Sequence, residues 1–400
     1  MKKFTLLLLL LPFMALAQTI TITGTLKDAT TNEPVEMASI GTLESNISVI
    51  SNETGDFRIT VPSATKSIYF SHLSYKAASL TLSGKDETVA IKLEQNQILL
   101  EETVITNKPI KEILKEAVSA SKKRLEKSLV LNTYYREFAK VNNHYLKFAD
   151  GLLDYNVKRK SGAADLYVQQ SRAKQLVDNN TQIFKKMKNG DTESNTDIVG
   201  AMNIYDVKEA VADASNFKII NKLLDADNYN YELKLRKNSD GKDIEIIKVI
   251  PKPEVHEILY EGQVVYEADT KLILEIDVRT AESHKQYADL INVLFFKFKL
   301  LNLAKKVVFK NANNKYILSY SQNRLSVYVT NKNKFDDTFD FMSDVVTIDY
   351  KEGEFEFDKN KRYKKKDLFS AGNNFTTEYW KTSNMLLLTA GEENVLKSFE

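Results

Sequence analysis

The most suggestive polar pair in this chain is Arg136 and Glu137, within the segment Tyr134-Tyr-Arg-Glu-Phe138. In a strand, Glu137 lies on one face, and Tyr134, Arg136 and Phe138 lie on the other. Arg136 then has apolar neighbours and needs a buried carboxylate partner. We expect an internal ion pair that locks the fold, and a role in gripping a ligand is the alternative.

Trp380 and Tyr266 complete the candidate binding or structural residues, which also include Tyr134, Arg136 and Glu137. Trp380, the single Trp of the chain, and its neighbour Tyr379 have the shape to stack on a sugar ring or close a cleft. A lone Trp more often packs in a core, and we expect that here. Tyr266 belongs to a run of alternating residues and is expected near an apolar sheet face.

Metal and cofactor sites have little support. The chain has no Cys and four His, namely His72, His144, His256 and His284. His256 and Glu257 are adjacent, and in a strand they point to opposite faces and cannot chelate together. His72 is expected to pack beside Tyr75. We predict no metal ligand, no cofactor and no catalytic residue.

Motifs for covalent or phosphoryl chemistry are missing from the sequence. It contains no Gly-x-Ser-x-Gly, P-loop or Gly-x-Gly-x-x-Gly pattern, and only 13 Gly. The adjacent carboxylate pairs, such as Asp336–Asp337 and Glu392–Glu393, are interpreted as solvated. The leading interpretation is therefore a protein that is not an enzyme.

The N-terminus has the pattern of a secretory signal peptide at residues 1–17: Lys2 and Lys3, an apolar run, then Ala15-Leu-Ala17. The run is too short to span a membrane, and no later segment qualifies, so the mature chain is expected to be soluble, without a transmembrane segment. Without Cys, it is not lipidated at an N-terminal Cys. Outside the signal, the chain has 54 basic and 54 acidic residues, so its formal charges cancel. This balance argues against a nucleic-acid partner.

The pattern after the signal predicts two domains. Short alternating runs in residues 18–94, separated by turn residues, predict a small β-sandwich. Residues 95–108 are interpreted as a linker. Residues 109–400 begin with a helix up to about Lys127 and continue with strands joined by local turns, which predicts an antiparallel meander.

Three parts of the second domain have another interpretation. The polar stretch Thr181–Asn203 is predicted to be a loop. A short helix is expected around Tyr205–Asp213. Leu290–Lys306 fits helix and strand equally well, because short apolar runs do not separate the two.

The first domain resembles the carboxypeptidase-regulatory-like domain of Bacteroidetes envelope proteins. The ordered motifs that carry the resemblance are Ile22-Thr-Gly-Thr-Leu26-Lys-Asp28, Thr31-Asn-Glu-Pro34, Asn52-Glu-Thr-Gly55-Asp56-Phe57, Phe70-Ser-His-Leu-Ser-Tyr75 and Leu100-Glu-Glu102-Thr-Val104. The resemblance implies a seven-stranded, transthyretin-like sandwich without a carboxypeptidase active site. It also implies the periplasm or the periplasmic face of the outer membrane.

The second domain resembles the periplasmic region of larger members of that family. Blocks such as Asn142-Asn-His-Tyr145, Tyr260-Glu-Gly262 and Glu378-Tyr-Trp380 carry this resemblance, and the strand rhythm is similar to LolA/LolB-type half-barrels. The predicted fold class is therefore mainly β with some α: the sandwich, then an α+β antiparallel domain like a half-barrel.

An open curved sheet must cover its apolar face with its own helices or with something bound. The residues expected near that face are Tyr231, Leu233, Leu259, Val264, Tyr266 and Ile276. We therefore expect a non-catalytic exported protein that binds a lipid-like ligand or an envelope partner protein. A hydrolase of envelope polymers, with carboxylates that only the fold brings together, and a pure interaction scaffold are the alternatives.

Overall fold

The structure, a computed structural model, describes residues 18–42, 45–96, 102–125, 128–158, 163–176, 206–225, 227–237, 241–293, 296–312, 315–331, 335–353, 355–377, 380 and 383–398. The predicted signal peptide, Tyr379 and the predicted loop 181–203 lie outside these residues. Within them, no helix has both the length and the apolar character needed to cross a membrane.

The N-terminal domain consists of two packed sheets, with strand orders β4-β1-β7 and β3-β2-β5-β6. Its strands are β1 (Thr19–Asp28), β2 (Ser39–Gly41), β3 (Ser48–Ile50), β4 (Asp56–Pro62), β5 (Ser67–His72), β6 (Tyr75–Thr81) and β7 (Glu87–Leu93). Alternate residues of these strands point inward, so each sheet has one apolar face. Phe57 and Phe70 meet edge to face across the core, with ring centroids 5.7 Å apart.

A large open antiparallel sheet follows, in the order β11-β10-β9-β19-β18-β17-β15-β14-β13-β12-β8, and β16 pairs with β17. Its strands are β8 (Glu102–Thr103), β9 (Leu129–Val141), β10 (His144–Val157), β11 (Ala164–Gln175), β12 (Tyr229–Lys237), β13 (Asp243–Pro251), β14 (Tyr260–Glu267), β15 (Ile273–Thr280), β16 (Leu290–Val293), β17 (Phe296–Ala312), β18 (Lys315–Asn331) and β19 (Phe335–Glu352). Strands β12 to β15 and β17 to β19 form the expected meander, and β9 then pairs with β19.

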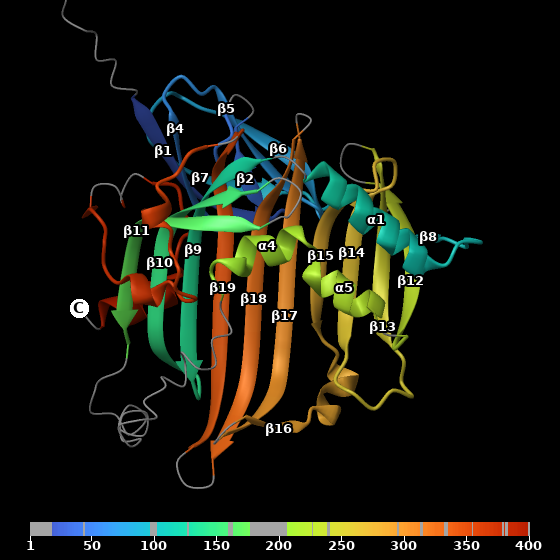
Figure 1. Ribbon diagram of the computed structural model, residues 1–400. Coiled ribbons are helices and arrows are strands. Elements are labelled where there is room, and N and C mark those ends of the chain that lie inside the picture. Colours follow the sequence, from blue (N-terminus) through green and yellow to red (C-terminus); the bar gives the residue numbers. More distant parts are fainter. Residues whose placement is uncertain are drawn as a thin grey trace, which may run out of the picture.

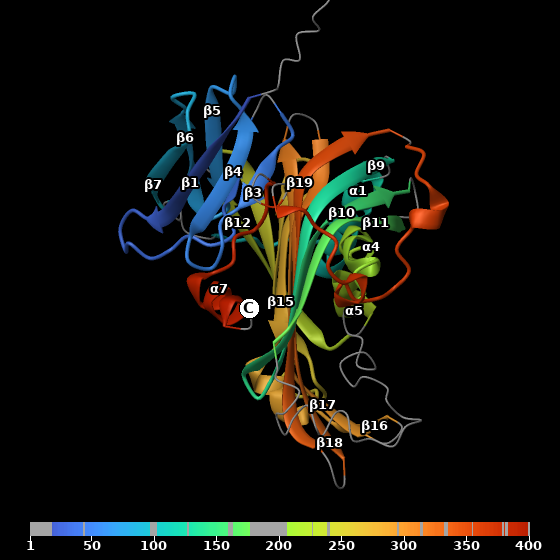
Figure 2. The same ribbon diagram turned by 90° about the vertical axis from the view of Figure 1, so that its left-hand side faces the viewer.

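Three α-helices described by the structure lie beside this sheet, and another follows it in the sequence. The structure contains α1 (Ile110–Arg124), α4 (Glu209–Ser215), α5 (Lys218–Asp225) and α7 (Ala390–Lys397), with short 3₁₀ turns η1 (Glu282–Tyr287), η2 (Lys359–Lys361) and η3 (Phe369–Ala371). Figure 1 shows α1, α4 and α5 in front of the sheet, and Figure 2 shows the N-terminal domain on its opposite side. We call these two sides the helix face and the sandwich face.

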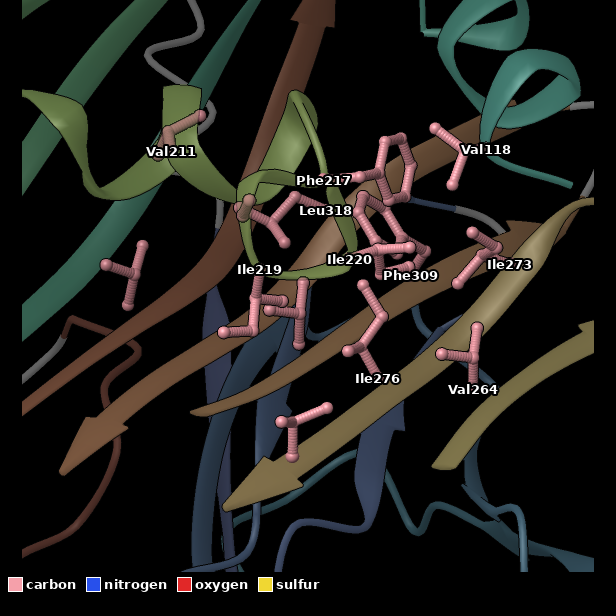
Figure 3. Packing of buried hydrophobic residues seen from close by; sticks show 14 of the residues in the cluster. Val118, Val211, Phe217, Ile219, Ile220, Val264, Ile273, Ile276, Phe309 and Leu318 are labelled. Carbon is pink, nitrogen blue, oxygen red and sulfur yellow. The ribbon is translucent and has the colours of Figure 1, made fainter. Parts of the chain in front are cut away.

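The main core lies between the helix face and the three helices. Figure 3 shows side chains of α1, α4, α5 and the central strands converging there, with Phe217 and Phe309 at a centroid distance of 5.2 Å. The residues expected on the apolar face all belong to this core or pack against it: Tyr231, Leu233, Leu259, Val264, Tyr266 and Ile276. The chain's own helices therefore cover this part of the sheet.

The sandwich face is joined to the N-terminal domain by apolar and polar contacts. Ile50 packs with Tyr134, Tyr320 and Val346 of the sheet. The side chain of Asn384 accepts from the Thr60 N–H (2.7 Å) and donates to the Thr60 carbonyl (3.0 Å), so the C-terminal segment is bonded to β4. The two domains and the C-terminal segment thus share one packed region.

Both outer strands of the large sheet have short partners. On β12, Lys234 pairs with Thr103 of β8. On β11, Ser171 forms an isolated bridge with Asn374. Segments remote in sequence thus occupy part of each edge.

The mainly β fold class, a small N-terminal sheet domain followed by a large antiparallel sheet, is confirmed. Within Leu290–Lys306, residues 290–293 form β16 and residues 296–306 belong to β17, so the described part of this segment is strand and not helix. Within the segment interpreted as a linker, residues 102–103 form β8. The expected helix at 205–213 begins at Glu209, and helices α5 and α7 were not predicted.

The placement of His256 and Glu257 on a strand was wrong. They lie in the loop between β13 and β14, because the chain turns after Pro251. There, the His256 ring stacks on Tyr287 at a centroid distance of 4.9 Å. Neither residue is part of a group that could hold a metal: the described residues contain no cluster of three or more His, Asp or Glu side chains suited to a metal ion.

Candidate functional site

A row of polar side chains crosses the helix face on four neighbouring strands. Lys305 of β17 pairs in register with Asn323 of β18, Asn323 with Ser343 of β19, and Ser343 with Glu137 of β9. Cross-strand partners point to the same side of a sheet, so the four side chains share the helix face. We call them the polar row.

A pocket of about 470 Å³ opens over the polar row beside helices α4 and α5. Lys305, Asn323 and Ser343 line it, together with apolar walls from Ile219 and Leu303. A volume of this size is typical of small-molecule sites. The pocket thus combines a polar floor with apolar walls.

Charged side chains of both signs surround the pocket. Lys218, Lys222 and Lys366 are exposed at its rim. Lys218 forms an ion pair with Asp213 at 3.1 Å. The rim cations can therefore attract an anion, while Lys305 lies deeper.

Lys305 is the least satisfied charge of the polar row. Burial lowers the pKa of its ammonium group, and the field of Asp213 opposes that shift only in part. Among the described residues, Lys305 has no hydrogen-bond or ion-pair partner. A buried cation without a close partner is costly, so it is a strong candidate for contact with an anionic ligand.

Glu137, at the other end of the polar row, is held by the protein itself. Its carboxylate accepts hydrogen bonds from the backbone N–H groups of Leu368 (3.2 Å) and Phe369 (2.9 Å), and from the Tyr135 hydroxyl (3.0 Å). Burial raises its pKa, while Lys147 and the two N–H donors oppose the shift. The hydrogen bonds of the Glu137 carboxylate thus hold the segment that follows residue 366 against the sheet.

An apolar strip continues the helix face beyond the pocket. The strip extends across neighbouring strands, because Leu303 pairs with Leu325 and Leu325 with Phe341, while Leu300 pairs with Val327. Its members form one cluster: Ala139, Val141, Leu146, Phe296, Phe298, Leu300, Leu325, Val327, Val329, Phe339 and Phe341. Leu325 belongs to both the strip and the pocket wall, so the two are continuous.

Arg136 lies on the opposite, sandwich face and has buried carboxylate partners. Its Nε donates to Asp344 at 2.8 Å and its Nη1 to Glu392 at 3.2 Å. Burial alone would raise the pKa of Asp344, but Arg136 and Arg324 outweigh it and lower that pKa. Arg136 thus ties β9 to β19 and to helix α7.

Tyr134 and Trp380 belong to a second polar group on the sandwich face. The Tyr134 hydroxyl donates to Asp150 at 2.9 Å, and Arg172 donates to the same carboxylate at 2.5 and 2.9 Å. Burial raises the Asp150 pKa against the effect of Arg172. The Arg172 guanidinium lies 4.7 Å from the Trp380 ring centroid, and Trp380 is buried in the core.

The five candidate residues predicted from the sequence do not form one site. Tyr134, Arg136 and Trp380 lie on the sandwich face, Glu137 lies on the helix face, and Tyr266 is buried beneath α1 in the main core. Sequence reasoning missed Lys305, Asn323 and Ser343. The only sequence signal for Lys305 is its position directly after the largely apolar run that begins at Leu300. The sheet face on which its side chain lies depends on the strand register.

Comparisons with known proteins identify the first domain. Residues 22–105 match the model of the CarboxypepD_reg-like domain. No curated protein matches the chain.

Three solved structures share only a remote likeness with it. Lipovitellin, described for its lipid–protein interactions, is 8% identical, with a TM-score of 0.26 over 66% of this chain, and the match spans 29% of lipovitellin. A DUF1329 family protein from Desulfovibrio piger is 11% identical, with a TM-score of 0.25 over 62% of this chain and 96% of its own. A LolA superfamily protein from Nitrosomonas europaea is 11% identical, with a TM-score of 0.19 over 61% of this chain and 94% of its own.

Proposed function

We propose that this chain is a non-catalytic binding protein for an amphiphile with an anionic head group. The observation that carries the proposal is Lys305, a largely buried cation without a described partner, placed where a pocket meets an apolar strip. A ligand anion would supply the missing partner. The head group would bind at the polar row, and the tail would lie along the strip.

The apolar strip supports the second half of this proposal. Phe298, Leu300 and Leu325 are only half-buried, although their cross-strand neighbours are apolar. Each methylene group that leaves water contributes roughly 0.8 kcal/mol. A tail of several carbons on this surface would therefore add substantially to the binding free energy.

The positions of Glu137 and Asp150 favour binding over hydrolysis. Glu137 and Asp150, whose pKa values are raised by burial, are both held by hydrogen bonds inside the protein. Neither of them lines the pocket over the polar row. A general acid must reach the substrate, and these two are engaged elsewhere.

The experiment is a titration of the mature chain with dodecanoate and with dodecanol, followed by calorimetry. The two probes have equal tails, and only the first is an anion. A hydrogen bond to a charged group contributes roughly 1.5–3 kcal/mol, so we expect dodecanoate to bind the protein about 10–100 times more tightly.

Lys305→Met should abolish that preference and leave dodecanol binding nearly unchanged. The matched control is Lys299→Met, because Lys299 is on the same strand but pairs with Tyr328, which points away from the helix face. The proposal fails if neither probe binds, or if Lys305→Met preserves the preference for the anion.

We further propose that the protein works in the cell envelope after export. The signal-like pattern of residues 1–17 and the CarboxypepD_reg-like first domain support this location. Cell fractionation combined with N-terminal sequencing tests it. A chain that begins at Gln18 in the envelope fraction would support export, and an unprocessed cytoplasmic chain would refute it.

A further inference from the structure

A second pocket, of about 420 Å³, lies between the N-terminal domain and the sandwich face of the large sheet. Its walls come from β2 and β5 on one side and from β15, β17 and β18 on the other. It is separate from the pocket at the polar row, because the large sheet lies between them.

The N-terminal domain presents a small, polar surface to this pocket. Ser39 pairs with Ser71, and Gly41 with Tyr69, so these four residues share one face of the β2-β5 pair. The intervening residues Ile40 and Phe70 point into the sandwich core, as do their apolar neighbours. The face that remains offers hydroxyl groups and a partly exposed tyrosine ring.

Lys310 reaches this surface from the large sheet. A Cβ atom added at Gly41 would lie 3.7 Å from the Lys310 Nζ, so the ammonium group lies close to β2. Among the described residues, Lys310 has no hydrogen-bond or ion-pair partner. Burial of this ammonium group lowers its pKa.

The other charged groups of the pocket are already engaged. Lys306 lies 3.6 Å from Glu275 and 3.7 Å from Asp277. Glu267 accepts two hydrogen bonds of 2.9 Å from Asn311 and one of 2.6 Å from Thr270. The positive charge of Lys310 is therefore left for another partner.

His72 also lines this pocket but brings no charge to it near neutral pH. Burial, with the nearby Lys306 and Arg236, lowers its pKa to about 4. Its Nδ1 accepts the Ser74 N–H at 3.1 Å, so the neutral ring carries its proton on Nε2. A neutral imidazole N–H is one more hydrogen-bond donor in the pocket.

We propose that the pocket between the two domains is a second binding site, which takes a small ligand that bears a carboxylate or phosphate group. Lys310 pairs with the anionic group, and the serine hydroxyls of β2 and β5 donate to it or to neighbouring polar atoms. The site is independent of the amphiphile site, since Lys310 and Lys305 lie on opposite faces of β17.

The test measures how well a ligand protects Lys310 from an amine-acetylating reagent, with the modified peptides quantified by mass spectrometry. The probes are glucuronate, glucose 6-phosphate and neutral glucose, which share a sugar ring and differ in the anionic group. We expect one or both charged sugars to slow the acetylation of Lys310 at least about tenfold, at concentrations where glucose has no effect.

The exposed Lys297 on the same strand is the internal control and should be acetylated at the same rate with every probe. Lys310→Arg should retain binding of the charged sugars in a calorimetric titration, and Lys310→Met should lose it. Lys305→Met should leave it intact, which separates this site from the amphiphile site.

Stronger protection by glucuronate would assign a carboxylate ligand, and stronger protection by glucose 6-phosphate a phosphate ligand. Equal protection by all three sugars, or none by any, would overturn the proposal. Loss of binding in Lys305→Met with retention in Lys310→Met would overturn it as well.

Discussion

Arg136 of β9 and Glu392 of helix α7 form a buried ion pair with a separation of 3.2 Å, although they are 256 positions apart in the chain. Glu392 also accepts the backbone N–H of Thr389, and Thr389 accepts the N–H of Glu392. The same carboxylate thus caps α7 and binds the sheet. This contact fixes the C-terminal helix beside the region where both domains meet.

Loss of one partner of this pair should destabilise the protein strongly. Arg136→Met leaves the carboxylates of Asp344 and Glu392 buried without their cation, which costs about 3–5 kcal/mol of unfolding free energy. Urea unfolding monitored by the fluorescence of Trp380 measures the cost. Arg279→Met is the control: its ion pair with Glu261 is exposed, so the loss should be at most about 1 kcal/mol. Equal losses for the two variants would contradict the role of Arg136.

Lys305→Met should increase stability while it removes binding of the anionic probe. Because burial lowers the pKa of Lys305 in the folded protein, the charged form carries a free-energy penalty at neutral pH. We expect a gain of roughly 0.5–2 kcal/mol at pH 7, from thermal unfolding. As pH rises through the lowered pKa, Lys305 loses its proton in the folded protein while it stays protonated in the unfolded chain. The stability gain of Lys305→Met should therefore shrink as pH approaches 10.5. A gain that stays constant up to pH 11 would contradict this origin.

His72 should make the protein acid-sensitive. Its pKa is about 4 in the folded protein, against 6.5 as the ordinary value, so the unfolded chain binds the proton first as pH falls. Stability should decrease between pH 6.5 and pH 4, by up to about 3 kcal/mol.

A comparison of unfolding curves at pH 7 and pH 4 tests this role of His72. His72→Gln should remove that part of the decrease, and the exposed His144→Gln should not. An identical loss in all three proteins would assign the acid sensitivity to other groups.

Gly262 should not tolerate a side chain. Its φ is +155°, and a Cβ atom added at this position of β14 would lie 2.0 Å from the Asp277 carbonyl oxygen on β15. We expect Gly262→Ala to cost about 2–4 kcal/mol in urea unfolding, through strain and a displaced strand pair.

Gly84→Ala is the matched control for Gly262→Ala. Gly84 also has a positive φ, of +80°, but no atom lies within 4 Å of the added Cβ. Only the backbone penalty of about 1–2 kcal/mol should remain. A larger cost at Gly84 than at Gly262 would refute the steric argument.

The sequence alone predicted the elements better than their contacts. Alternation around Tyr134–Phe138 was enough to require a buried partner for Arg136, because the period of a strand places it among apolar residues. The partners Asp344 and Glu392 lie 208 and 256 residues away, and no local pattern encodes that pairing. Helix α7, which supplies Glu392, was not predicted. The interpretation of Glu392 as solvated was wrong, because its side chain is buried beside Arg136.

Lys305 shows the same limit at the candidate site. Its place on the helix face depends on the pairing with Asn323 and on a register shift between Leu300 and Asn302. An irregularity of one residue moves every later side chain to the other face of a strand. The composition of β17 therefore did not reveal which of Lys305 and Lys306 lies on the helix face.

The partly covered edges of the large sheet have a consequence for association between molecules. A long sheet with bare outer strands is a template on which further copies can add strand by strand. Here Thr103 occupies part of the β12 edge, and Asn374 interrupts the β11 edge at Ser171. Both of these edge contacts come from segments outside the meander. A protein that lost residues 102–103 or its C-terminal segment would therefore expose an outer strand on which fibres could grow.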